Sequence, residues 1–327
     1  MTTLATGLGL LAKKTSVALG HFPTPVEEMV RFRQALGLSQ RIFIKRDDAI
    51  SFGFGGNKVR KLRYVIPELK GQGVDTIITC GGVQSNHARA TAAAAAAHGL
   101  ACHIVVNGAE PVRPTGNALL NRLLGATFEY VAGREGRVPG MEAAAARFRS
   151  EGRRPAVLPL GASTPVGALG FADAVTELVA QDAVPEVIVH ACSSGGTSAG
   201  LLTGVAMHDL ATRVIGISAD DPPEAVETQV RSIARGMAGL LGLDPGALDA
   251  AIWLEVDDSF VGTGYGEPTA ASTEAQRIAA RTEAVFVDHT YTAKALAGLI
   301  AYCRDGRIPP NAKVLFWHTG GQVALFA

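Results

Sequence analysis

A glycine-rich segment that ends in a lysine is the first feature able to carry chemistry. Residues 52–58 read Phe-Gly-Phe-Gly-Gly-Asn-Lys, and a helical pattern follows Lys58. Glycines let the backbone approach a ligand closely, because no Cβ intervenes. Burial and a helix N-terminus would both lower the pKa of the lysine amine, and the neutral amine is the form that attacks a carbonyl. Lys58 is therefore a candidate nucleophile, and a surface lysine beside a turn is the alternative.

Two loops between a predicted strand and a predicted helix carry further polar groups. An alanine-rich helix begins with residues that either cap it or bind an anion such as a carboxylate, namely Gln84, Ser85, Asn86 and His87. The loop 193–200 combines hydroxyls with glycines, which favours phosphate binding over a simple tight turn. This loop matches neither a nucleotide-binding P-loop nor a nucleophile elbow.

The C-terminal third places tyrosines beside glycines. Tyr265 lies in Gly-Thr-Gly-Tyr-Gly and Tyr291 in Asp-His-Thr-Tyr-Thr, and each is either a stacked core residue or an acid–base group at the mouth of a site. Near the N-terminus, Gly7, Gly9 and Ala12 fit the G-x-G-x-x-A pattern of dinucleotide-binding proteins. Because no strand is predicted before them, we interpret this match as chance.

These loops need strands and helices to position them, and the two kinds of element alternate along the chain. Strands are predicted at 41–47, 75–82, 102–108, 127–133, 186–193, 213–220 and 313–321. Helices are predicted at 56–73, 85–99, 115–125, 171–181 and 272–284. Alternation of apolar strands with helices indicates an α/β class with parallel sheets, in which ligands lie beyond the carboxyl ends of strands. The polar stretch 133–154 is the one soft boundary that the composition suggests.

The composition argues against several classes of protein. The 327 residues are 47% hydrophobic and 18% charged with a formal net charge of zero, which favours neither nucleic acid nor an anionic membrane as a partner. No apolar run reaches the roughly 20 residues of a membrane-spanning helix. Lys13 and Lys14 follow the apolar N-terminal run, the wrong order for a signal peptide, so we expect a cytoplasmic protein. The scattered cysteines predict buried reduced thiols and no metal site.

The motifs from about residue 40 onward resemble those of fold-type II pyridoxal-5′-phosphate (PLP) enzymes. KRDD…GGNKxRKL, GGVQSNHxR, the loop 193–197, GYGxP at 264–268 and YTxKAxAGLI at 291–300 occur in the same order. Within that group the chain is similar to the D-cysteine desulfhydrase / 1-aminocyclopropane-1-carboxylate (ACC) deaminase family, which includes L-cysteate sulfo-lyases. The resemblance implies two open twisted, mostly parallel sheets flanked by helices. It also implies a large cofactor-binding domain (1–53 and 166–327), an inserted small domain (54–165) and a homodimer.

The resemblance assigns roles to the motif residues. Lys58 would form the covalent link with the aldehyde of PLP, and Asn86 would contact its ring hydroxyl. The PLP phosphate would be bound by Lys61, Ser194, Gly195, Gly196 and Thr197. The amino-acid substrate and its carboxylate would contact Gln84, Ser85, Asn86 and His87. The catalytic residues would be Lys58, Ser85, Tyr265 and Tyr291.

One position distinguishes members of the family. ACC deaminases have a glutamate after the matching tyrosine, whereas this chain has Thr292. A hydroxyl cannot supply the charge that favours a protonated pyridine nitrogen, and Thr319 is a second candidate partner for that nitrogen. A weakly protonated ring suits β-elimination better than ring opening. We therefore expect conversion of D-cysteine to pyruvate, sulfide and ammonia, with freed Lys58 or a tyrosine as the base.

Two departures from the family pattern leave the substrate open. Residues 49–52, Ala-Ile-Ser-Phe, replace the commoner Cys-x-Ser-Gly, and His289-Thr290 stands where Pro-Val is usual. L-cysteate sulfo-lyase and ACC deaminase activities remain alternatives. An NAD-dependent oxidoreductase and a PLP-binding protein without catalysis are the alternatives from other classes.

Overall fold

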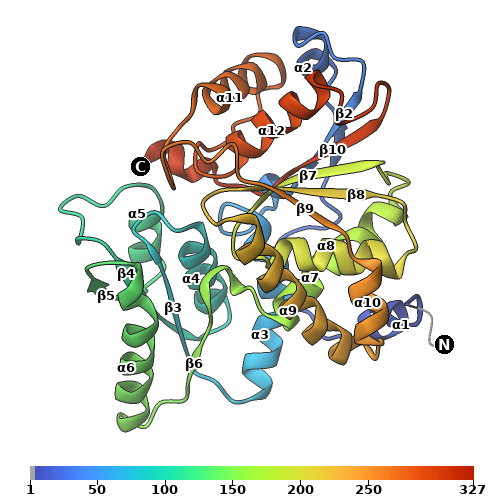
Figure 1. Cartoon of the computed structure of the whole chain (residues 1–327). Helices are drawn as coiled ribbons and strands as arrows, with labels where there is room; N and C mark the ends of the chain where they lie inside the picture. The colour runs from blue at the N-terminus through green and yellow to red at the C-terminus, as the bar shows by residue number, and fades with distance from the viewer. Residues whose placement is uncertain (1–3) are drawn as a thin grey trace.

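The computed structural model describes residues 4–327 and contains two open, mostly parallel sheets with helices on both faces (Figure 1). This arrangement confirms the predicted α/β class. Residues 1–3, at the start of the N-terminal segment considered above, lie outside the described residues.

The larger sheet has six strands, and β1 alone runs antiparallel to its neighbour. In spatial order they are β1 (Val26–Glu28), β2 (Arg41–Arg46), β10 (Lys313–His318), β7 (Val187–Cys192), β8 (Arg213–Ser218) and β9 (Leu254–Asp257). Alternate residues of a strand face opposite sides of a sheet. In β10, Leu315 and Trp317 accordingly belong to one buried cluster, and Val314 and Phe316 belong to another. The strand is apolar throughout because both of its faces are buried.

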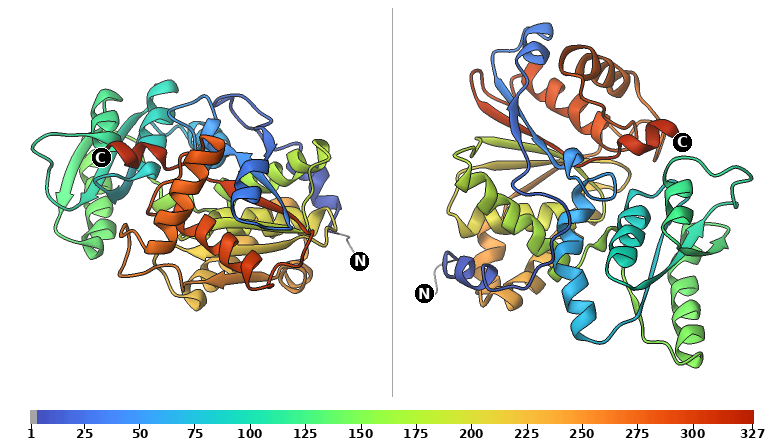
Figure 2. Two further views of the ribbon diagram at one scale, coloured as in Figure 1. Left: turned by 90° about the horizontal axis from the view of Figure 1, so that it is seen from above. Right: turned by 180° about the vertical axis from the view of Figure 1, so that it is seen from behind.

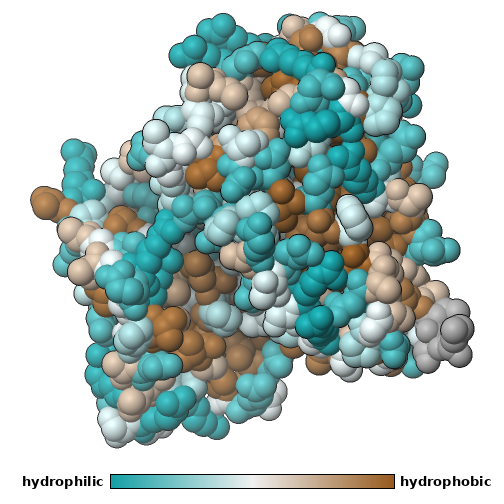
Figure 3. Space-filling view, viewed as in Figure 1, coloured by the Kyte–Doolittle hydropathy of each residue, from teal (hydrophilic) through white to brown (hydrophobic). Residues whose placement is uncertain are grey.

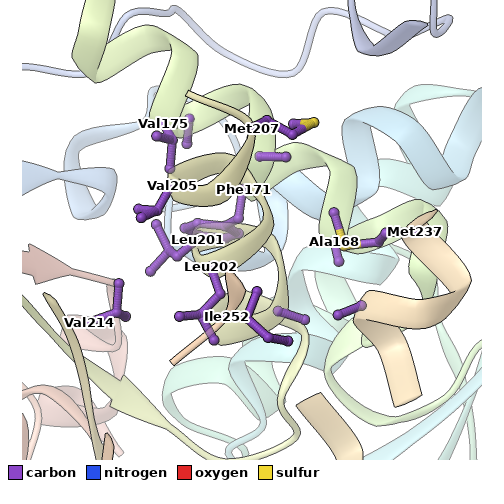
Figure 4. Packing of buried hydrophobic residues seen from close by; sticks show 14 of the residues in the cluster. Ala168, Phe171, Val175, Leu201, Leu202, Val205, Met207, Val214, Met237 and Ile252 are labelled. Atoms are coloured by element: carbon purple, nitrogen blue, oxygen red, sulfur yellow. The ribbon is translucent and has the colours of Figure 1, made fainter. Parts of the chain in front are cut away.

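Two groups of helices cover the large sheet. One face carries α1 (Thr6–Leu11), α7 (Pro165–Ala180), α8 (Gly196–Met207), α9 (Pro223–Leu241) and α10 (Pro245–Ala251). The other face carries α2 (Val30–Ala35), α11 (Ala270–Glu283) and α12 (Thr292–Arg304). Figure 4 shows how Phe171 of α7 and Leu201 and Leu202 of α8 pack together in the first of these clusters. This packing fixes the position of α8, and with it the position of the loop that precedes the helix.

The smaller sheet has four parallel strands: β5 (Thr127–Val131), β4 (Ala101–Asn107), β3 (Thr76–Gly82) and β6 (Pro155–Val157). Ile77 of β3 faces a cluster formed with α3 (Asn57–Gly71) and α4 (Asn86–Ala97), and Ile78 faces α6 (Arg137–Ser150). Helix α5 (Gly116–Leu123) packs beside α4. The C-terminal turn η4 (Gln322–Phe326) returns to α5, so that the end of the chain lies against the small-sheet region (Figure 2).

All seven predicted strands and all five predicted helices are present; α7 begins at Pro165, well before the predicted start at 171, and the other ends shift by a few residues. The prediction of a soft boundary at 133–154 is wrong, because most of this stretch forms α6, whose alanines pack on the small sheet. The division into 1–53 with 166–327 and 54–165 stays a prediction.

The described part of the chain contains no helix that is both long and apolar enough to cross a membrane. Within residues 4–327 there is also no cluster of three metal-binding side chains. Cys80, Cys102, Cys192 and Cys303 are buried free thiols, which confirms that prediction. The surface mixes polar and apolar residues, and apolar side chains gather toward the lower left of the face seen in Figure 3.

Candidate active site

A cavity of about 270 Å³ lies at the carboxyl ends of strands from both sheets. It is bordered by Gly82 at the end of β3, Cys192 at the end of β7 and Thr319 after β10. Most of the predicted site residues line it: Lys58, Lys61, Ser85, Asn86, His87, Ser194, Gly195, Thr197, Tyr265, Tyr291 and Thr319. Gln84, Gly196 and Thr292 are not among the lining residues. The fold thus brings together segments that are far apart in the sequence.

Lys58 is the second residue of α3 and follows a turn that requires glycine. Gly56 has φ of 98°, and a Cβ at this position would lie 3.0 Å from the carbonyl oxygen of Thr319. The Nζ atom of Lys58 donates to Oδ1 of Asn57 at 2.9 Å. Burial and the nearby charge of Arg89 lower the pKa of Lys58 to about 8, although Asp288 acts in the opposite direction. A substantial fraction of this amine is therefore neutral near physiological pH.

Arg89 is a site residue that the sequence reasoning did not identify. It lies buried on α4 and donates to the carbonyl oxygens of Phe54 at 3.3 Å and Gly55 at 2.9 Å. These contacts hold the glycine-rich turn in front of Lys58. Arg89 thus positions the turn and also disfavours the protonated form of Lys58. The only sequence signal was its place in the GGVQSNHxR motif.

A buried ion network fixes α3 from the opposite side. Arg60 and Asp47 are fully buried, and Nη2 of Arg60 lies 2.7 Å from Oδ1 of Asp47. Arg60 also pairs with Glu177 of α7 at 2.9 Å. Burial alone would raise the pKa of Glu177, but Arg60 and Lys45 lower it to about 2. Nε1 of Trp317 donates to the other oxygen of Asp47 at 2.8 Å, so the network joins α3 to the centre of the large sheet.

Lys61 is a buried cation without a carboxylate partner among residues 4–327. Its Nζ donates to the carbonyl oxygen of Gly161 and to the hydroxyl of Ser163, both at 3.1 Å. Burial, and then the charge of Lys58, place the pKa of Lys61 well below its ordinary value. A buried ammonium group that lacks a counter-charge is expected to bind an anion.

The loop between β7 and α8 lies directly against Lys61. A Cβ on Gly196 would be 2.8 Å from Nζ of Lys61 and 2.7 Å from Oγ of Ser163. Only a glycine at this position therefore lets the loop lie so close to Lys61 and Ser163. Gly195 has φ of 78°, which favours glycine for a second reason. Ser163, which the sequence reasoning missed, also lies 2.8 Å from the hydroxyl of Ser194. Together the Lys61 amine, these two hydroxyls and the N-terminus of α8 would bind an anion.

The start of α4 holds the second polar group of the cavity. Ser85 caps the helix, because its hydroxyl oxygen accepts from the amide of Ala88 at 3.1 Å, and this leaves its proton free to donate. Oδ1 of Asn86 accepts from Asn117 at 2.9 Å. The ring nitrogens of His87 lie near two threonine hydroxyls, and burial keeps its pKa well below the ordinary value. Gln84 faces α5 instead, where its oxygen accepts from the amide of Asn117 at 2.8 Å.

Tyr265 and Tyr291 form a hydrogen-bonded pair on the opposite wall. Their rings meet edge to face, with centroids 5.7 Å apart. Burial raises the pKa of Tyr265 and places that of Tyr291 well above its ordinary value. Both hydroxyls are therefore protonated at neutral pH. They can donate a proton or a hydrogen bond but are poor bases.

Thr292 lies behind the cavity and is held by a buried aspartate. Its hydroxyl donates to Oδ1 of Asp288 at 2.6 Å, and the amides of residues 290, 291 and 292 also donate to this carboxylate. A Cβ on Gly321, which lines the cavity, would lie 2.3 Å from the same oxygen, so Asp288 lies directly behind this glycine. Thr319 lines the cavity directly. Asp288 was part of a motif in the sequence, but its role depends on a contact that no spacing reveals.

The arrangement fits PLP. Lys61 and the loop 194–197 would hold its phosphate, because Lys61 is buried and has only neutral oxygen partners among the described residues. Lys58 supplies an amine whose lowered pKa suits attack on an aldehyde. Thr319 and Asn86 offer polar contacts for the edges of a ring.

Comparison with known proteins agrees with this geometry. The family model of pyridoxal-phosphate dependent enzymes matches residues 17–320. A 1-aminocyclopropane-1-carboxylate deaminase of Burkholderia ambifaria is 39% identical over 93% of this chain and 94% of its own length. The protein of the same name from Burkholderia vietnamiensis is 40% identical over the same shares.

Solved structures give the same result. A crystal structure of an ACC deaminase homologue superposes with a TM-score of 0.90 and 33% identity, covering 98% of this chain and 96% of the other. Threonine deaminase isoform 2 from Solanum lycopersicum has a TM-score of 0.69 and 17% identity, covering 97% of this chain and 84% of the other, and shows the shared fold alone. This chain therefore belongs to the pyridoxal-phosphate dependent enzymes, as a fold-type II member of the ACC deaminase family.

Proposed function

We propose that this enzyme is a β-eliminating lyase acting on a small amino acid, with D-cysteine as the first candidate. The supporting observation is the kind of polar groups, carboxylates or hydroxyls, that the chain offers in and beside the cavity. The carboxylates among the described lining residues are Asp220 and Asp221, and both act electrostatically on Arg134. Position 292 carries a hydroxyl where ACC deaminases are expected to have a glutamate. A weakly protonated pyridine is a poorer electron sink, which disfavours ring opening more than loss of a good leaving group.

Different residues of the chain bind the substrate and remove its proton. Bound PLP supplies the electron sink for negative charge at Cα. The hydroxyl of Ser85 and the amides at the start of α4 bind the substrate carboxylate. Lys58, with its pKa near 8, takes the proton from Cα, because the two tyrosines hold their own protons too strongly to act as bases.

The same proposal accounts for the leaving group. The Cβ–S bond breaks, and its electron pair leaves with sulfur as hydrosulfide. One hydroxyl of the Tyr265–Tyr291 pair donates to the other, and the remaining proton can be donated to that anion. Addition of water to the resulting aminoacrylate gives pyruvate and ammonia.

A second candidate, ACC deaminase activity, is favoured by Asp288. Its buried charge acts on Lys58 and lies just behind Gly321, so it can favour a protonated ring even without a glutamate at position 292. The curated relatives named above are 1-aminocyclopropane-1-carboxylate deaminases. L-cysteate sulfo-lyase activity is a third member of the same mechanistic class.

The test is a product analysis with purified holoenzyme. D-cysteine, L-cysteine, both enantiomers of cysteate and ACC are supplied separately, and sulfide, sulfite, pyruvate and 2-oxobutyrate are measured. Sulfide and pyruvate from D-cysteine would support the first candidate, and 2-oxobutyrate from ACC the second. Lys58→Ala should abolish turnover of every substrate, because it removes the cofactor link and the base together. Retained turnover in this variant would contradict the assignment.

We also propose that the enzyme acts as a homodimer in the cytoplasm and takes only a small amino acid as its partner. The resemblance to the family and the balanced charge of the chain support this proposal. Light scattering coupled to size-exclusion chromatography measures the oligomeric state directly.

A further inference from the structure

We propose that Arg137 forms a binding site for an anionic group on Cβ of the substrate. The substrate class would then include β-sulfonated amino acids such as cysteate, beside amino acids whose sulfur leaves as an anion. This inference rests on the proposed β-elimination and names the part of the cavity that receives the leaving group.

Arg137 is placed for this role by two elements of the small sheet. It is the first residue of α6, it lines the cavity, and it is half-buried. Its Nε atom donates to Oδ1 of Asn107, the last residue of β4, at 2.7 Å. This anchor fixes the guanidinium group through one nitrogen. Within residues 4–327, its two terminal nitrogens have no hydrogen-bond partner in the protein, so a ligand can use both.

The charge of Arg137 is also uncompensated in the described part of the chain. Arg134, three residues earlier, forms an ion pair with Asp220 and lies 4.8 Å above the ring of Tyr265. Asp221 acts electrostatically on Arg134 as well. No carboxylate of residues 4–327 lies within 4.0 Å of Arg137. Of the two arginines in the cavity, Arg137 is therefore the one that can attract a substrate anion.

The field of Arg137 reaches the reacting side of the cavity. Its positive charge opposes the rise in the pKa of Tyr265 and of Tyr291, so it acts on both hydroxyls of the tyrosine pair. These are the hydroxyls assigned above to the leaving group. A negative group beside the tyrosine pair would therefore also be attracted by the guanidinium group of Arg137.

The cavity offers two other places for an anion besides Arg137. Lys61 with the loop 194–197 accounts for the phosphate of PLP, and the start of α4 with Ser85 accounts for the α-carboxylate of the substrate. An amino acid with a neutral side chain has no third anion. A planar guanidinium group with two free nitrogens matches the paired oxygens of a sulfonate or carboxylate. Arg137 thus fits a substrate that carries a second negative charge.

The elimination of cysteate balances without any further reactant except water. The Cα proton passes to Lys58, the Cβ–S bond breaks, and its electron pair leaves with sulfur as sulfite. Water adds to the aminoacrylate, and the overall products from one cysteate anion and one water are pyruvate, hydrogen sulfite and ammonium. No oxidant or reductant is needed.

The test separates binding from turnover by using aspartate and asparagine. Aspartate carries a β-carboxylate that cannot leave, and asparagine is its neutral isostere. Binding of both enantiomers to the holoenzyme is followed by the change in cofactor absorbance and by calorimetry. Loss of a charge-assisted pair of hydrogen bonds corresponds to about a 10- to 100-fold change in affinity. We expect aspartate to bind more tightly than asparagine by about that factor in the wild-type enzyme.

Arg137→Leu should bring the two affinities to within about twofold, since only the charged ligand uses the guanidinium group. Arg137→Lys should restore part of the difference, because it keeps the charge but loses the planar fork. Arg149→Leu is the matched control, since Arg149 is an exposed arginine of the same helix outside the cavity. It should leave the ratio unchanged.

Sulfite release from cysteate is measured with the same proteins and should fall in Arg137→Leu by at least as much as aspartate binding. Sulfide release from D-cysteine, together with equal affinities for aspartate and asparagine in the wild type, would overturn the inference and leave the proposed function intact. Preferential, Arg137-dependent binding of aspartate without release of sulfide or sulfite would support the anion site and contradict the β-elimination.

Discussion

Replacing Lys61 by methionine tests the assignment of the phosphate site. The side chains are similar in length, so the substitution removes the buried charge with little change in packing. In the wild type, Nζ of Lys61 has two neutral oxygen partners at 3.1 Å and no carboxylate within the described chain. The phosphate of PLP is then its natural counter-charge. A hydrogen bond between charged groups contributes about 1.5 to 3 kcal/mol, which corresponds to a factor of about 10 to 150 in the dissociation constant.

The assay compares two forms of the cofactor. Apo-protein is titrated with PLP and with pyridoxal, which lacks the phosphate, and binding is followed by absorbance. Lys61→Met should weaken PLP binding by the factor given above and leave pyridoxal binding unchanged. Lys70→Met is the control, because Lys70 is an exposed lysine in the last turn of the same helix. Equal PLP affinity in Lys61→Met and wild type would refute the assignment.

The apo-protein offers an independent measurement. Because burial places the folded-state pKa of Lys61 well below 10.5, the folded apo-protein binds fewer protons at this site than the unfolded chain does. The contribution of Lys61 therefore destabilises the apo-protein at neutral pH and becomes less unfavourable as the pH rises toward 10.5. Apo Lys61→Met should consequently require more urea to unfold than apo wild type at pH 7. A lower midpoint would show that the ammonium group is already compensated in the folded chain.

Two further predictions concern the groups that position Lys58. Arg89→Met should raise the pKa of Lys58, because Arg89 lowers it, and the pH dependence of PLP attachment to apo-protein should shift to higher pH; an unshifted profile would contradict this. Asp47→Ala should destabilise the holoenzyme by about 3 kcal/mol in urea denaturation, since it leaves Arg60 buried with only part of its counter-charge. Asp305→Ala, at an exposed ion pair, should cost less than about 1 kcal/mol, and equal losses in both variants would refute the importance of the buried network.

The sequence predicted the elements whose pattern is local. Strand β10 was predictable because Val314, Leu315, Phe316 and Trp317 form a continuous apolar run. Strands β1 and β6 have only three residues each, and β9 is half-buried throughout, so none of them carries a clear pattern. Helix α6 was misread as a boundary because its arginines and glycines outweighed the alanine run that packs on the sheet.

In the candidate site, too, the sequence predicted the residues that lie close together in the chain and missed contacts that depend on the fold. Lys58 and Lys61 were predictable because they share one helix with a glycine-rich turn before it. Arg137 and Tyr291 are 154 positions apart in the sequence, and both line the cavity only because the two sheets border it together. Asp288 and Thr292 lie close in sequence, but the hydrogen bond between them depends on the backbone turn that starts α12. Gln84 was grouped with its neighbours by motif, whereas its side chain turns toward α5.

The buried network around Arg60 connects the helix of the reactive lysines to the large sheet. Arg60 lies between Lys58 and Lys61 in the sequence, and through Asp47, Trp317 and Glu177 it ties their helix to the large sheet. Ser85 and Arg137, in contrast, come from the small sheet. Helix α3 also packs on the small sheet with α4, so the amine and the phosphate site are anchored to both sheets and keep a fixed position relative to Ser85 and Arg137.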